Sequence, residues 1–302
     1  MSLVGKSTTM IAVAYHSAVP DVVRFAQLAQ SMSMRLIVVA NDLSPARYQV
    51  PGCEVMTPTK NLGFGAGCNY AAATVCTERI LFVNLDVDLQ VDHIVAMASF
   101  GSKHSGVVAP LLVEPGLVGL DPKSLLVPSV LSEYVMYRSW FNLRAQCDRL
   151  ALRILEASTN QTHIVVERCP GAALQVGVRE FRQVGGFDES FFCYGEDVDL
   201  CWRLEAMGVP VYLLLDVVVG HSQGTGSTTS STTRARLQTE GELKVTRRIW
   251  GWPFALLQFV QLVTGALLTV RLRDSGVREA TSVVRGRFLG GRALIRNAAW
   301  AP

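Results

Sequence analysis

Short apolar segments alternate with longer segments of helical periodicity through the first third of the chain, and this alternation constrains the fold most. The apolar runs occupy residues 10–14, 36–40, 53–56 and 80–83, and the helical patterns occupy residues 19–32 and 66–76. This alternation of strand and helix patterns is typical of βαβ units and predicts an α/β fold with a mainly parallel central sheet flanked by helices. Ligands of these sheets bind beyond the carboxyl ends of the strands.

Polar residues gather where the predicted strands end. They are Tyr15 and His16 after the first run, Asn41 and Asp42 after the second, and the segments 61–69 and 84–88 further along. Because carboxyl ends of parallel strands share one edge of the sheet, these segments define the expected site.

The segment NLGFGAGCN at residues 61–69 is a glycine-rich turn that opens a predicted helix. Backbone N–H groups in such a turn bind phosphate, and glycine lets a nucleotide approach closely. Asp86 follows Gly67 by 19 residues, so the dinucleotide fingerprint of a nicotinamide-dependent oxidoreductase competes with this interpretation. Against that alternative, the loop does not follow the first strand, and the third glycine of the fingerprint is missing.

The segment NLDVD at residues 84–88 follows an apolar strand. On an extended backbone the side chains of Asp86 and Asp88 point the same way, so their oxygens could share a hard divalent cation or frame a metal-bound diphosphate. His221, at the end of the apolar run VYLLLDVVVG, would complete the site with a neutral imidazole. Strand-end acids and histidines also serve simply as loop or cap residues.

Residues 185–203, GGFDESFFCYGEDVDLCWR, interleave five carboxylates with five aromatic rings. Acids held against apolar rings lose solvation, which raises a carboxyl pKa and produces a general base near neutral pH. The structural alternative is a helix N-terminus that favours negative charge, with Asp199 and Arg203 paired at i,i+4.

Charge is distributed unevenly. The chain has 302 residues and a net charge of +3, yet residues 234–302 carry 12 basic and 4 acidic residues. This basic end suggests an anionic surface as its partner, and no nucleic-acid partner is expected.

The seven cysteines are scattered and form no CxxC pair. This usage fits a reduced, cytoplasmic setting. The apolar run near the N-terminus is too short for a signal peptide, so no export is expected.

Residues 249–270 form an uncharged apolar stretch long enough to cross a bilayer. Gln258, Gln261 and Thr264 recur on one helical side, which favours a helix lying on a membrane; a buried or dimer helix and a true span are the alternatives. Flanking arginines and Trp250 resemble interfacial anchors. Residues 114–150, which include Tyr134, Tyr137, Trp140 and Phe141, suggest a lid or acceptor wall, and the low-complexity segment 222–233 predicts a loop.

Seven motifs in order resemble the family 2 inverting glycosyltransferases of GT-A fold, specifically their rhamnosyltransferase-like branch. They are YHS, VVANDLS, NLGFGAGCN, FVNLDVD, CPGAAL, GGFDESFFCYGEDVDLCWR and HSQGTGS, and they span roughly residues 10–228. The resemblance implies a GT-A domain over residues 1–228, followed by a basic, apolar helical region over residues 229–302 for membrane association or dimerisation.

The resemblance also implies roles for individual residues. Asp197, the second acid of the ED pair, is the expected base. The expected acceptor contacts are Asp188, Glu189, Glu196 and Trp202; the donor contacts are Tyr15, Asn41, Asp42, Asn61, Gly63, Gly65, Asn69, Asn84 and Asp86; and the ligands of a Mg2+ or Mn2+ ion are Asp86, Asp88 and His221. One departure concerns the DN.S motif, where this chain has Ala40, Asn41 and Asp42: either Asp42 is displaced by one position and still reaches the base, or Ala40 replaces the family aspartate.

These observations predict a cytoplasmic enzyme, peripheral on the inner face of the cell membrane. It would transfer rhamnose or another hexose from a dTDP- or UDP-sugar to a hydroxyl of a lipid-linked or cell-surface glycan during polysaccharide synthesis. A catalytically inactive membrane-associated partner of such a complex is the further alternative.

Overall fold

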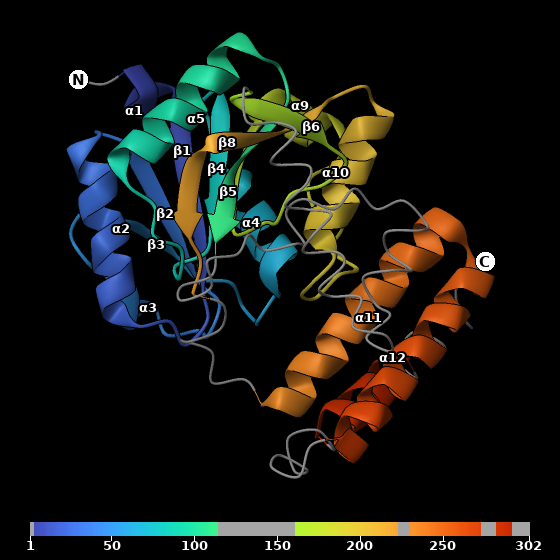
Figure 1. Ribbon diagram of the computed structural model, residues 1–302. Coiled ribbons are helices and arrows are strands. Elements are labelled where there is room, and N and C mark those ends of the chain that lie inside the picture. Colours follow the sequence, from blue (N-terminus) through green and yellow to red (C-terminus); the bar gives the residue numbers. More distant parts are fainter. Residues whose placement is uncertain (1–2, 114–160, 223–229, 273–281, 292–302) are drawn as a thin grey trace. The chain divides into compact units, whose positions relative to one another are not determined.

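An eight-stranded mixed sheet organises the first part of the molecule, for which a computed structural model describes residues 3–113, 161–222, 230–272 and 282–291 (Figure 1). The strands are β1 (Thr8–Ala14), β2 (Arg35–Ala40), β3 (Glu54–Met56), β4 (Arg79–Val83), β5 (Val107–Val113), β6 (His163–Val166), β7 (Ala173–Gly177) and β8 (Val211–Gly220). Their order is β3-β2-β1-β4-β7-β5-β8-β6, and only β6 and β7 run antiparallel to their neighbours. The predicted α/β fold with a mainly parallel sheet is therefore confirmed.

The sheet is covered on both faces because its central strands are apolar on both sides. The helices around it are α1 (Leu3–Ser7), α2 (Val19–Ser31), α3 (Pro45–Tyr48), α4 (Phe64–Ala72), α5 (Val91–Lys103), α9 (Val178–Gln183) and α10 (Glu196–Ala206). Helices α2 and α5 pack with Met10, Ala12 and Leu81 on one face, whereas α4, α9 and α10 pack with Ile11 and Phe82 on the other. Alternate residues of one strand thus enter opposite cores.

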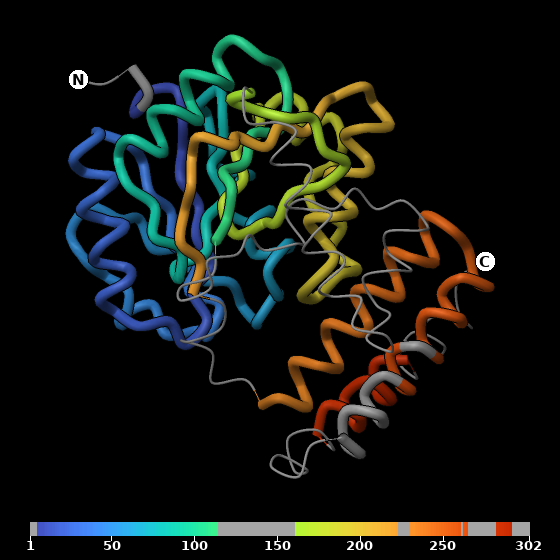
Figure 2. Tube along the Cα trace, viewed as in Figure 1, coloured from blue at the N-terminus to red at the C-terminus, as the bar shows by residue number. Residues whose placement is uncertain are grey.

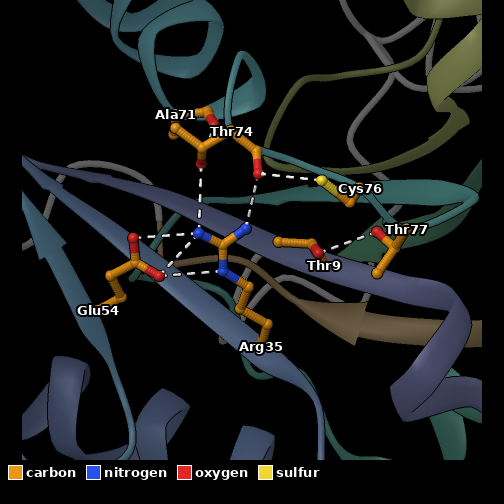
Figure 3. Close-up of polar contacts among 7 residues, drawn as sticks. All are labelled: Thr9, Arg35, Glu54, Ala71, Thr74, Cys76 and Thr77. Carbon is orange, nitrogen blue, oxygen red and sulfur yellow. Dashed lines mark hydrogen bonds and ion pairs between the residues drawn. The ribbon is translucent and has the colours of Figure 1, made fainter.

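A polar cluster at the amino end of β2 fixes the edge of the sheet (Figure 3). Arg35 donates through Nε and Nη2 to the Glu54 carboxylate of β3, at 3.0 and 2.8 Å, and through Nη1 to the Thr74 carbonyl at 2.9 Å. These bonds tie the short strand β3 to β2 and to the end of α4. They lie at the end of the strands opposite to the expected site.

The described residues form two compact units. The first contains residues 3–113, 161–190 and 197–222, and the second contains residues 191–196, 230–272 and 282–291 (Figure 2). The predicted boundary between residues 228 and 229 stays a prediction. The aromatic segment 114–150, which was expected to form a lid or acceptor wall, lies outside the described residues.

The second unit is helical, with α11 (Ser231–Trp250), α12 (Trp252–Leu272) and a further helix over residues 282–291. Leu243 of α11 packs with Phe259 and Leu262 of α12. The chain turns between the two helices at Gly251, whose φ of 85° lies in the left-handed region that glycine adopts readily.

One expectation about this unit is wrong. Residues 231–233 were expected in a loop, yet they begin α11, because Ser230 caps the helix by accepting a hydrogen bond from the Thr233 amide at 3.2 Å. Gln258, which the sequence places on the polar side of a helix expected to lie on a membrane, is buried. Within the described residues, no helix combines the length and apolarity needed to span a membrane.

Candidate active site

The strand ends meet at one edge of the first unit, as the sheet pattern predicts. Strands β1, β2 and β4 are parallel neighbours, and the antiparallel β7 begins at Ala173, opposite Val83 at the end of β4. The carboxyl ends of β4 and β8 are joined directly, because Val87 and His221 form a β-bridge. The segments expected to form the site therefore share this edge.

Asp86 and His221 form the central pair of the edge. His221 Nε2 lies 3.3 Å from Asp86 Oδ1, and both side chains keep limited access to solvent, with 13% and 29% exposed. The backbone enforces the pairing: Asp88 donates its amide to the Gly220 carbonyl at 2.7 Å, and Ser222 donates to the Asp86 carbonyl at 3.1 Å. Two residues far apart in sequence are thus held as neighbours.

Asp88 does not join this pair in a three-residue cluster. Residues 85 and 86 form a turn rather than extended backbone, so the alternation that was expected to align the two carboxylates is lost. Asp88 is exposed, and its Oδ1 accepts a hydrogen bond from Gln90 Nε2 at 2.6 Å. Among the described residues, no group of three His, Cys, Asp or Glu side chains is arranged to hold a metal, and the ligand set of Asp86, Asp88 and His221 stays a prediction.

The remaining pair nevertheless suits a divalent cation that also binds the donor. A carboxylate and an imidazole are acceptable ligands for Mg2+ or Mn2+, and a site with few protein ligands leaves coordination positions for phosphate oxygens and water. Asp86 and His221 would be the protein ligands in that case.

The glycine-rich loop is anchored to the end of β2 by Asn41. The buried Asn41 amide donates to Asn61 Oδ1 and to the Gly63 carbonyl, both at 2.9 Å, and its oxygen accepts from the Leu62 amide at 2.9 Å. Gly63 precedes α4 with a φ of 83°, a conformation that favours glycine. The loop therefore presents the first turn of α4, with Gly65, in a fixed position at the site edge.

The Asp42 side chain is buried and hydrogen-bonded within the protein. Only 1% of its side chain is exposed, and Oδ2 accepts from the Tyr48 hydroxyl at 2.6 Å and from the His16 amide at 3.1 Å. Burial, together with the neighbouring Asp42 carboxylate, raises the pKa of Tyr48 to about 12, so the phenol stays protonated and donates at neutral pH. Asp42 thus ties the loops after β1 and β2 together, and its contact with a donor base stays a prediction. Tyr15 is exposed beside the His16 ring.

Asp197 stands in the first turn of α10, half-buried and held through both carboxylate oxygens. Oδ2 accepts from the Gly171 amide at 2.8 Å, and Oδ1 accepts from the Val198 amide at 2.8 Å. The next residue after Gly171, Ala172, accepts through its carbonyl from the Asn84 amide at 2.8 Å. Residues 171 and 172 therefore connect the predicted base to the segment that carries Asp86.

The segment 186–189 is held by Asn69, which was expected to contact the donor. The Asn69 side chain accepts from the Phe187 amide at 2.9 Å and donates to the Phe187 carbonyl and to Glu189 Oε1, at 2.8 and 3.1 Å. Asp188 accepts from the Ser190 amide at 2.8 Å within a local turn. Asn69 thus shapes the predicted acceptor segment, and its donor contact stays a prediction.

The remaining residues of the acidic segment have different surroundings. Asp199 is buried and pairs with Arg203 at 2.7 Å, as the i,i+4 spacing predicts. Glu196 is also buried, whereas Trp202 is 36% exposed on α10. Residues 196–206 form a helix, so the structural interpretation of this segment is confirmed, and the role of Asp197 as the base stays a prediction.

Sequence reasoning assigned no role to Gly171. Its motif, CPGAAL, contributes to the family resemblance without a function of its own. A Cβ added at Gly171 would lie 3.3 Å from Asp197 Cβ and 3.4 Å from Phe64 Cε1, so a side chain larger than hydrogen would crowd the predicted base. No local pattern shows this proximity, because the two residues lie 26 positions apart.

Comparison with known proteins gives the fold its family context. No family model matches the sequence. The chain is 28% identical over 158 residues to rhamnosyltransferase WbbL of Escherichia coli (strain K12), a match that covers 50% of this chain and 57% of that relative. The chain therefore spans little more than half the length of this curated relative.

Two solved structures share the architecture. GalNAc-T7 with UDP, GalNAc and Mn2+ matches with a TM-score of 0.55 and 11% identity, covering 97% of this chain and 56% of the other. Mannosyltransferase PcManGT from Pyrobaculum calidifontis, in complex with GDP-Man and Mn2+, matches with a TM-score of 0.54 and 12% identity, covering 98% and 88%. The chain therefore has the GT-A fold of nucleotide-sugar glycosyltransferases and resembles their rhamnosyltransferase branch in sequence.

Proposed function

We propose that this protein is an inverting glycosyltransferase that moves rhamnose or another hexose from a dTDP- or UDP-sugar to a hydroxyl of a lipid-linked or cell-surface glycan. The observation that carries the proposal is the assembly of Asp86, His221 and Asp197 on one connected edge of a GT-A sheet. The Ala172 carbonyl accepts from the Asn84 amide and the Gly171 amide donates to the Asp197 carboxylate, which links the donor segment to the predicted base.

The donor side of the proposed reaction uses Asp86, His221 and the glycine-rich loop. A divalent cation bound by Asp86 and His221 would neutralise charge on the departing nucleoside diphosphate. The loop held by Asn41 presents backbone N–H groups at the start of α4, where a phosphate is favoured. Both solved structures that share the fold are complexes with Mn2+ and a nucleotide or nucleotide sugar, which supports this assignment.

The acceptor side uses Asp197. Its carboxylate takes the proton of the acceptor hydroxyl while that oxygen bonds to the anomeric carbon, and the bond from this carbon to the diphosphate oxygen breaks. The amides of Gly171 and Val198 hold the carboxylate and leave lone pairs for this proton. A single displacement without a covalent intermediate inverts the anomeric configuration, which NMR coupling constants of the product would report.

Turnover of nucleotide sugars tests the proposal. Purified protein is incubated with UDP-, dTDP- and GDP-sugars and a membrane-lipid extract, with Mn2+ or with EDTA. The expected result is release of one nucleoside diphosphate together with glycosylation of a lipid, and loss of both with EDTA. Absence of turnover and of nucleotide-sugar binding would overturn the proposal and favour the inactive-partner alternative.

We also propose that α12 places the enzyme on an anionic membrane. The helix exposes several of its apolar residues: Leu256, Leu257 and Val260 are 60%, 47% and 50% exposed, whereas Gln258 is 6% exposed. A water-exposed helix shows the opposite pattern, and an apolar outer face suits the lipid interface. Trp252, also exposed, lies under the Arg247 guanidinium at 4.8 Å.

The basic residues near the exposed apolar face of α12 favour an anionic lipid surface, rather than a second copy of the chain, as its partner. Arg247 and Arg248 end α11 beside it, and residues 234–302 carry 12 basic against 4 acidic residues. Two copies would bring like charges together, whereas anionic headgroups attract them. A peripheral position on the inner face of the cell membrane, near a lipid-linked acceptor, follows from this proposal.

Replacing Leu256 and Leu257 together by glutamate should weaken binding to vesicles by at least about tenfold, because each exposed leucine loses burial in lipid. The measurement is flotation with phosphatidylcholine vesicles, with and without phosphatidylglycerol. Met207→Glu, at an exposed apolar position of the first unit, is the matched control. Equal flotation of both variants would contradict the proposal, as would a dimer in light scattering that only the leucine variant dissociates.

A further inference from the structure

Arg24 reaches from α2 to the turn that carries Asp86. Its Nη2 donates to the Leu85 carbonyl at 3.0 Å and to the Val87 carbonyl at 2.9 Å. The two acceptors are the carbonyls of the residues immediately before and after Asp86 in the chain. One guanidinium nitrogen therefore holds both flanks of the residue expected to bind the cation.

The guanidinium is placed by its packing as well as by these bonds. Its central carbon lies 4.6 Å from the centroid of the Phe25 ring. Nη1 is removed from solvent and has no hydrogen-bond partner among the described residues. A buried nitrogen without a hydrogen-bond partner lowers the stability of the fold. Stability alone therefore does not account for an arginine at position 24.

Arg24 adds to the hydrogen bonds that hold the turn. The Val87 amide reaches the Asn84 carbonyl only at 3.4 Å, and the Asp86 carbonyl is taken by Ser222. The bond to the Leu85 carbonyl fixes the peptide plane before residue 86, and the bond from Ser222 to the Asp86 carbonyl fixes the plane after it. Those planes set the direction in which the Asp86 side chain leaves the backbone toward His221.

We propose that Arg24 is a positioning residue that orients Asp86 for the divalent cation and the donor diphosphate. The inference rests on the proposed function of Asp86. Partners that orient a metal ligand without touching the metal typically change its affinity by about 10- to 100-fold when removed. Lysine would keep the charge but lacks the rigid planar group that Arg24 uses to reach two carbonyls.

Arg79 provides a matched control in the same unit. Its guanidinium also bridges two carbonyls, donating to Gly101 at 3.0 Å and to Gly106 at 2.9 Å. Arg79 begins β4, at the end of the strand opposite to Asp86. A merely structural arginine should therefore behave like Arg79 when it is replaced by lysine.

The experiment compares Arg24→Lys and Arg79→Lys by thermal unfolding, by calorimetric titration of UDP and dTDP with Mn2+, and by hydrogen exchange of residues 84–90 and 217–222. Arg24→Lys is expected to weaken diphosphate binding about tenfold or more and to speed exchange in both segments. Arg79→Lys is expected to lower the melting temperature at least as much without changing diphosphate affinity. The donor KM should rise in Arg24→Lys.

The outcomes separate this inference from the proposed function. Wild-type protein that binds neither diphosphate would overturn both. Wild-type binding that Arg24→Lys retains unchanged would overturn the positioning role alone. That role is equally overturned if both variants lose affinity in proportion to their melting temperatures, because Arg24 would then only support the fold.

Discussion

Asp197→Asn is expected to lower kcat for glycosyl transfer by about 100- to 10,000-fold, the range that a general base contributes. The amide oxygen of asparagine can still accept from Gly171 or Val198, but the variant cannot take the acceptor proton. Its NH2 group would also face one backbone N–H that now has no acceptor. Because Asp197 is not a proposed donor ligand, affinity for the nucleotide sugar should stay close to that of the wild type.

Transfer rate and donor affinity are measured separately, by product formation under saturating donor and by calorimetry. Asp216→Asn, at an exposed position of β8, removes the same charge away from the site and is expected to leave both quantities unchanged. If Asp197→Asn turned over at the wild-type rate, the base would have to be another group. A loss of donor binding equal to the loss of rate would instead indicate a damaged fold.

The fold was largely predictable because short segments of the sequence are enough to indicate its strands and helices. The strand over Met10 to Ala14 is apolar on both faces, as central parallel strands are, and the Glu196 helix start follows from its acidic first turn. Glycines and polar residues then mark where each strand ends. Consequently the edge of the sheet that carries the site could be inferred before any contact was known.

The contacts within that edge were less predictable because they join distant segments. Asp86 and Asp88 were expected to point the same way from an extended backbone, but residues 85 and 86 form a turn, and their joint role stays a prediction. Asn69 lies in the glycine-rich motif, yet its partners are residues 187 and 189. Arg24 sits on an ordinary helix pattern, and its carbonyl partners lie 61 and 63 positions away.

The same limit applies to the second unit. The sequence periodicity correctly places Gln258 on a different side of the helix from Leu256, but periodicity does not say which side faces solvent. Polar residues usually face water, but Gln258 is buried. The burial of Gln258 is known only from the structure.

Asp86→Asn should weaken Mn2+-dependent binding of the donor diphosphate by about 100-fold or more, since a removed partner of a charged group typically costs several kcal/mol. The variant keeps the size of the side chain but removes the charge that an ion would meet beside His221. His221→Gln should have a similar but smaller effect, because a neutral ligand is lost. Asp88→Asn is expected to change affinity much less, as its carboxylate is exposed and bonded to Gln90.

Calorimetric titration of UDP and dTDP, with Mn2+ and with EDTA, distinguishes these variants. In EDTA the wild type should fall to the weak affinity of Asp86→Asn, because both conditions remove the same interaction. Asp216→Asn again controls for loss of one negative charge. If Asp88→Asn were as impaired as Asp86→Asn, both carboxylates would contact the ion in the donor complex, and the turn after β4 would have to rearrange on binding. If neither substitution mattered, the cation would not be held by this edge of the sheet.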